Sequence, residues 1–151
     1  MTPLALALNA ALAAGEEIVK LRTSAELKVS LKTNVRNLVT TADVRAEQII
    51  IQAIRTQYPD HAILAEESAP DLRDREKLRG PLWVIDPIDG TTNYAHGHHQ
   101  VGVSIAFCDR GEVQAGVVYA PFLNETFAAE RGKGATLNGK KIAVSTQTSL
   151  G

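Results

Sequence analysis

The chain has 151 residues, of which 44% are hydrophobic, and its 16 basic and 17 acidic side chains leave a formal net charge of −1. This length and composition predict one domain with a substantial core, which excludes an intrinsically disordered protein. Because the charges balance, the chain has no basic field of the kind that attracts nucleic acid nonspecifically, and nucleic acid is not an expected partner.

Two helices are predicted in the first 58 residues. Pro3 is typical of a first helical position, and apolar residues then recur at helical spacing to about Leu21. Residues 31–41 are expected to be irregular or extended, and they lead into a second helix with apolar residues on one face. Tyr58 and Pro59 end that helix, because proline disfavours helical backbone in the residue before it.

The remainder of the chain reads as short strands separated by turn signals, of which Asn138-Gly139 is typical of a hairpin. Residues 69–80, rich in charge, are predicted to form a mobile surface loop. The predicted strands are residues 62–65, 82–85, 101–107, 113–120 and 126–129. The fold class is therefore α+β, with two helices packed on one face of a mostly antiparallel sheet. The other face then requires a cover, either a further segment of chain or a second copy.

The compartment expected from the sequence is the cytoplasm. The first basic residue is Lys20, and Glu16-Glu17 interrupt the apolar N-terminal run, which argues against a secretory signal. The single cysteine, Cys108, cannot form an internal disulfide and lies in a strand-like run. No stretch is long enough to span a membrane.

The most informative segment is Asp-Pro-Ile-Asp-Gly-Thr-Thr-Asn at residues 86–93. Glu66 follows one predicted strand and Asp86 the next, so neighbouring strands could bring these carboxylates together beside Asp89. Pro87 orients the carbonyl of Ile88 as a further oxygen donor. Mg²⁺ prefers hard oxygen ligands and keeps positions open for phosphate oxygens, so this pattern predicts a magnesium site. Two such ions about 4 Å apart would activate a water and stabilise a leaving oxygen.

Gly90, Thr91 and Thr92 predict a phosphate site beside the metal ligands. Glycine lets backbone approach an anion closely, and a helix that begins here would turn its free N–H groups and positive dipole end toward the phosphate. The Thr91 hydroxyl could also orient the attacking water. The chemistry predicted is one-step hydrolysis of a phosphate ester by metal-activated water.

Simpler interpretations exist for several of these residues. Asp-Pro-x-Asp-Gly alone is a good turn. Glu67 should point away from Glu66, since neighbouring strand residues face opposite sides. Asp43 fits a helix cap and a site residue equally well. Three histidines lie close together in the sequence: His96, His98 and His99. Their imidazoles could form a zinc site, but His61 is the only further histidine. The preferred interpretation is that they line a loop beside the pocket.

Three segments together resemble the inositol monophosphatase family in order and spacing. They are Leu38-Val39-Thr40 with Asp43, then Ala65-Glu66-Glu67-Ser68, then the run from Trp83 to Asn93. Gly116 to Tyr119 and Arg131 to Gly139 also resemble later strands of the family, so the resemblance covers nearly the whole chain.

The resemblance implies roles for individual residues. Glu66, Asp86, Asp89 and the Ile88 carbonyl would bind Mg²⁺, with Asp43 near a more weakly held ion. Thr91 with Glu66 would activate water, and the amides at Gly90 and Thr91 would receive phosphate. It further implies lithium inhibition, a homodimer, and a layered αβαβα sugar-phosphatase fold of which residues 1–151 are the N-terminal α+β half.

The chain departs from the family in length. Members continue for about another hundred residues, as expected of a complete domain of this size, and carry a second motif around Trp-Asp. Trp83 is the only tryptophan here, so that motif is absent. The leading hypothesis is a Mg²⁺-dependent phosphomonoesterase for inositol 1-phosphate or a similar polyol or sugar phosphate, with fructose 1,6-bisphosphate as an alternative. The competing hypothesis is a non-catalytic module that binds metal, phosphate or a protein partner.

Overall fold

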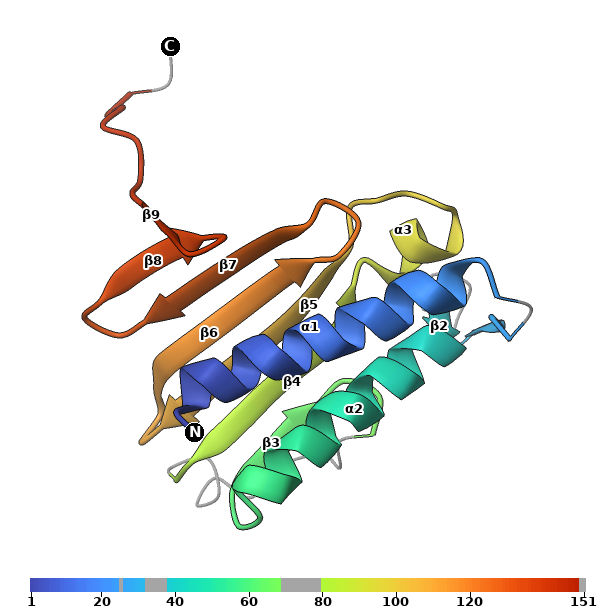
Figure 1. Cartoon of the computed structure of the whole chain (residues 1–151), viewed down its shortest axis with the longest axis horizontal. Coiled ribbons are helices and arrows are strands. Elements are labelled where there is room, and N and C mark those ends of the chain that lie inside the picture. The colour runs from blue at the N-terminus through green and yellow to red at the C-terminus, as the bar shows by residue number, and fades with distance from the viewer. Residues whose placement is uncertain (25, 32–37, 69–79, 150–151) are drawn as a thin grey trace.

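The computed structural model describes residues 1–24, 26–31, 38–68 and 80–149 (Figure 1). The loop predicted at residues 69–80 lies outside this part of the chain except for Gly80, as do residues 32–37 of the predicted irregular segment. None of the helices in the described ranges combines the length and the apolar character that crossing a membrane requires.

The two predicted helices are present, and each has a recognisable start. Helix α1 (Pro3–Arg22) begins after Thr2, whose side-chain oxygen accepts the N–H of Ala5 at 3.3 Å. Helix α2 (Thr41–Gln57) begins after Thr40 with a capping box, in which Asp43 bonds back to the backbone of Thr40. Such caps satisfy N–H groups that have no partner inside the helix. The predicted stop at Tyr58 is confirmed.

In the described residues, seven strands form one sheet in the same order as in the chain, and a separate two-stranded ribbon joins β1 to β2. Among these strands, β3 and β4 are parallel and the other neighbours are antiparallel, so the predicted fold class is confirmed. The strands are β1 (Val29–Leu31), β2 (Leu38–Thr40), β3 (Ala62–Ala65), β4 (Leu82–Asp89), β5 (Gly102–Asp109), β6 (Glu112–Ala120), β7 (Glu125–Glu130), β8 (Gly134–Leu137) and β9 (Lys140–Ile142).

Strand β4 is longer than predicted, because it continues through Pro87 to Asp89 rather than ending at Ile85. The pairing with β5 shifts between Asp86 and Asp89, which marks a bulge. A bulge tolerates proline, since one residue leaves the regular hydrogen-bond ladder. The short helix α3 (Thr91–Ala95) follows directly.

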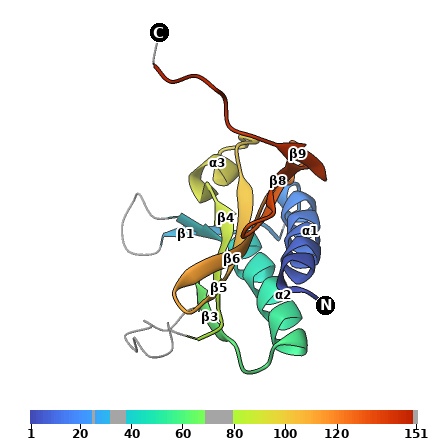
Figure 2. The ribbon, with the colours of Figure 1, turned by 90° about the vertical axis from the view of Figure 1, so that its left-hand side faces the viewer.

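Both long helices lie on the same face of the sheet (Figures 1 and 2). Their buried residues pack with strand residues such as Trp83, Ile105 and Val117, all at most 2% exposed. On the other face of the described sheet, the large side chains of Val118 and Phe127 remain 44% and 38% exposed. The predicted uncovered face is therefore present.

The contact between α1 and β6 requires a glycine. A Cβ on Gly15 would lie 2.7 Å from Cδ1 of Tyr119 and 3.2 Å from Cβ of Pro121. Both distances are shorter than the ordinary van der Waals separation, so a side chain here would force the helix away from the sheet.

We therefore expect overpacking in Gly15→Ala to cost about 1–3 kcal/mol. Because alanine gains about 1 kcal/mol over glycine in a helix interior, the expected net destabilisation is up to about 2 kcal/mol. Urea unfolding measures the difference, and the double variant Gly15→Ala/Tyr119→Val should recover part of it. A more stable Gly15→Ala protein would contradict the contact described.

Candidate metal and phosphate site

A buried carboxylate joins the start of α2 to the start of α3. Asp43 is 1% exposed, and its Oδ2 accepts the N–H and the hydroxyl of Thr40 at 2.8 and 2.6 Å. Its Oδ1 accepts the hydroxyl of Thr91 at 2.9 Å. The Thr91 oxygen also lies 3.1 Å from the carbonyl oxygen of Ile88, a second acceptor for the same proton. Asp43 is thus a helix cap and a contact of Thr91 at once.

The turn from β4 into α3 depends on a glycine. Gly90 has φ 94° and ψ 36°, a left-handed conformation that side chains disfavour, and a Cβ would lie 2.9 Å from the carbonyl oxygen of Gln100. The carbonyl of Gly90 accepts the N–H of Tyr94 at 2.9 Å. Gly90 is therefore the N-cap of α3, and Thr91 and Thr92 are its first two residues. The condition set by the sequence for a phosphate site, a helix that begins here, is met.

Three acidic side chains gather where β3 and β4 end. The last parallel pair is Ala65 with Ile85, so Glu66 follows beside Asp86. Burial, then the neighbouring Glu66 carboxylate, and further the charge of Asp89 raise the pKa of Asp86 from 3.8 to about 7. Like charges held this close disfavour ionisation of the buried member.

The cluster fits a hard divalent cation in its chemistry. Oδ1 of Asp86 is buried and has no hydrogen-bond partner, a costly state that a cation would relieve. Carboxylate and carbonyl oxygens are also the donors that Mg²⁺ prefers. As the described side chains stand, no three acidic, histidine or cysteine residues are arranged as a ready ion site.

The raised pKa of Asp86 predicts a pH-dependent stability. The folded chain holds this proton more tightly than the unfolded chain, so the contribution to stability is complete below about pH 4 and lost as the pH rises through about 7. We expect Asp86→Asn to raise the Tm of the metal-free protein more at pH 8 than at pH 4.5.

Calorimetry in the presence of a chelator provides this measurement, with Asp60→Asn as a control that removes a carboxyl from the exposed surface. An equal change in Tm at both pH values for Asp86→Asn would contradict the description of a half-buried carboxyl repelled by its neighbours.

Sequence reasoning missed Glu47. It is 2% exposed, and its Oε2 accepts the N–H of Glu67 at 2.7 Å. The signal was available: Glu47 lies four residues after Asp43, on the same buried face of α2 as Ala46 and Ile50. A charged residue at a core position of a helix is unusual unless it has a partner.

The histidines do not form a common metal site in the described part of the chain. His61 accepts the indole N–H of Trp83 on Nδ1 at 3.1 Å. His96 Nδ1 lies 2.8 Å from the Thr92 carbonyl oxygen, and His99 stacks on Phe122 with ring centroids 5.4 Å apart. These separate contacts give no support to a shared zinc site within the described residues, and the interpretation of a loop beside the pocket stays a prediction.

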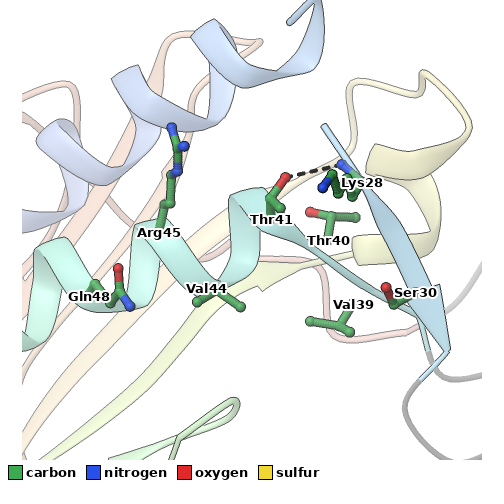
Figure 3. Close-up of a pocket in the computed structure, with 8 residues that line it drawn as sticks. All are labelled: Lys28, Ser30, Val39, Thr40, Thr41, Val44, Arg45 and Gln48. Atoms are coloured by element: carbon green, nitrogen blue, oxygen red, sulfur yellow. Dashed lines mark hydrogen bonds between the residues drawn. The ribbon is translucent and has the colours of Figure 1, made fainter. Parts of the chain in front are cut away.

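A surface pocket of about 390 Å³ lies where the β1–β2 ribbon meets α2 (Figure 3). Sequence reasoning did not predict it, and it contains none of the three clustered acids. Arg45 extends from its wall to ion pairs with Glu17 at 3.1 Å and with Glu26. The lining residues are Lys28, Ser30, Val39, Thr40, Thr41, Val44, Arg45 and Gln48.

The whole chain, residues 1–151, matches the model of the inositol monophosphatase family. The chain belongs to this family. It is 46% identical over 122 residues to a fructose-1,6-bisphosphatase/inositol-1-monophosphatase from Thermotoga maritima, a match covering 81% of this chain and 45% of the relative. It is 41% identical over 140 residues to the Nus factor SuhB of Vibrio cholerae, covering 92% of this chain and 51% of the relative.

A solved structure of an IMPase/NADP phosphatase in complex with Mg²⁺ and phosphate has the same fold. It matches with a TM-score of 0.76 and 29% identity, over 85% of this chain and 48% of that one. The family member described here thus spans about half the length of the relatives it matches.

Proposed function

We propose that residues 1–151 form the metal- and phosphate-binding α+β half of a Mg²⁺-dependent phosphomonoesterase. The observation that carries this proposal is the acidic cluster of Glu66, Asp86 and Asp89, in which a buried oxygen of Asp86 has no partner. The relative solved with Mg²⁺ and phosphate supports the assignment.

In this proposal, Glu66, Asp86, Asp89 and the Ile88 carbonyl bind Mg²⁺. The bound ion supplies Lewis-acid stabilisation of the phosphate and a more acidic water. The backbone N–H groups of Gly90, Thr91 and Thr92, at the start of α3, hold the phosphate oxygens.

Asp43 determines how Thr91 acts. Because its Oδ1 accepts the Thr91 hydroxyl proton, the lone pairs of Thr91 Oγ1 are left to accept a hydrogen bond from a water. That water would attack the phosphorus from the side opposite the leaving oxygen as the phosphate ester bond breaks. The Glu66 carboxylate would take the proton of the water, and the departing alkoxide would take a proton from solvent. Hydrolysis then needs no covalent enzyme intermediate.

The substrate class proposed is a phosphorylated polyol or sugar, with inositol 1-phosphate first. The double name of the Thermotoga maritima relative supports fructose 1,6-bisphosphate as the alternative. We further propose a homodimer in the cytoplasm that is sensitive to lithium. The similarity to a Nus factor favours a second candidate, a non-catalytic module that binds metal, phosphate or a protein partner.

We expect Mg²⁺-dependent release of phosphate from inositol 1-phosphate, lowered by at least about 100-fold in Asp89→Asn, since even outer-shell partners of a metal are worth 10- to 100-fold. Phosphate release is measured with and without a chelator, with fructose 1,6-bisphosphate assayed in parallel. Calorimetric Mg²⁺ binding without any turnover would instead support the binding module.

The proposed role of the Thr91 hydroxyl in positioning the attacking water gives a second test. Thr91→Ala should lower kcat by about 10²–10⁴, the usual contribution of a positioned proton-transfer group. Thr91→Ser keeps the hydroxyl that bonds Asp43 and should retain most of the activity. If both variants lose activity equally, the threonine methyl rather than the hydroxyl matters, and the assigned role is wrong.

A further inference from the structure

We propose that Glu47 is a positioning residue: it fixes the turn after β3 so that Glu66 faces the aspartates of β4. The expected effect of Glu47 on metal affinity rests on the proposed function. The hydrogen bond by which Glu47 fixes the turn can be tested without any metal.

The contact is made where regular pairing ends. Strand β3 has four residues and, among the described strands, is the edge strand beside β4; the last pair in the register is Ala65 with Ile85. Two residues later, the N–H of Glu67 donates to Oε2 of Glu47 at 2.7 Å. This bond fixes the backbone of the residue next to Glu66, and so constrains where the Glu66 side chain begins.

Stability alone does not account for a carboxylate at this position. Glu47 is 2% exposed among the apolar residues of α2, and a buried carboxylate is costly to desolvate. Replacing a buried charged group with an apolar side chain of similar volume is often neutral or stabilising. The Glu47 carboxylate, which accepts one backbone N–H beside a proposed metal ligand, is therefore better explained by a role in orienting Glu66.

Helix α2 thus carries the residues that contact both sides of the proposed site. Asp43 and Glu47 lie four residues apart, so they share one face of the helix and are separated by about 6 Å along its axis. Asp43 holds Thr91 at the start of α3, and Glu47 holds the turn that carries Glu66. The segments that directly follow β3 and β4, on either side of the clustered acids, are thereby bonded to the same helix.

The experiment compares Glu47→Met with Glu47→Gln in the full chain. Methionine fills the space but accepts no strong hydrogen bond, whereas the glutamine carbonyl can still accept the N–H of Glu67. Gln48→Met, on the exposed side of the same helix, is the matched control. The readouts are Mg²⁺ affinity by calorimetry, Tm, and hydrogen exchange of the Glu67 amide in the metal-free protein.

For Glu47→Met we expect Mg²⁺ affinity to fall by about 10-fold or more, as for other partners that orient metal ligands. Its Glu67 amide should exchange at least about 10-fold faster, while Tm stays close to that of the original chain. Glu47→Gln should keep the amide protected and the affinity within about threefold, and Gln48→Met should change neither.

Unchanged amide exchange in Glu47→Met would overturn the inference, and so would a parallel loss of affinity and Tm in both Glu47 variants, which indicates a general structural role. If the original chain binds no Mg²⁺, the proposed function fails, and the amide exchange still decides whether Glu47 holds the turn.

Discussion

The hydrogen bonds of the buried Asp43 carboxylate are the interaction on which the rest of the structure depends. They connect the end of β2 and the first turn of α2, which follow one another in the chain, to the start of α3, 48 residues further on. A carboxylate this deeply buried is tolerated because each oxygen accepts at least one hydrogen bond. Removing either Thr40 or Thr91 would leave part of that charge without a partner, so the two threonines are constrained by the same group.

The acids of this chain fall into two groups with opposite physical states. Asp43 and Glu47 are buried and bonded, so they fix structure. Asp86 is close to Glu66 and Asp89, and one of its oxygens has no partner. The hydrogen-bonded acids lie on helix α2, whereas the acid with an unpartnered oxygen, Asp86, lies on strand β4. Repulsion between neighbouring carboxylates, maintained by a well-packed surrounding structure, is typical of functional sites.

The sequence predicted features that depend on residues close together in the chain, such as a helix start and a hairpin turn. The start of the first helix follows from Pro3, and the hairpin follows from Asn138-Gly139, where both residues adopt positive φ. The extended segment before the second helix was also predicted, but the N-cap of that helix, Thr40, was not. The uncovered face followed from having only two helices for one sheet.

The other features that the sequence did not predict have one cause in common: each depends on contacts between residues that are distant in the chain. The extension of β4 through Pro87 depends on a bulge against β5, and no local signal distinguishes that bulge from a turn. Glu47 was passed over because a glutamate in a helix is normally exposed, and its partner, the Glu67 N–H, is 20 residues away. The two readings of Asp43 could not be separated from sequence because both describe its contacts.

The site and the uncovered face are continuous, and this links the chemistry to whatever covers the sheet. Asp86 pairs with Ser104, Ser104 with Val118, and Val118 with Phe127. Residues directly opposite one another on neighbouring strands share a face, so Asp86 lies in the same row as the exposed Val118 and Phe127. A cover over that row would remove water from around Asp86 as well. Lower polarity raises the cost of the repelled carboxylates and strengthens their attraction for a cation, so covering the face would strengthen cation binding at the proposed metal site.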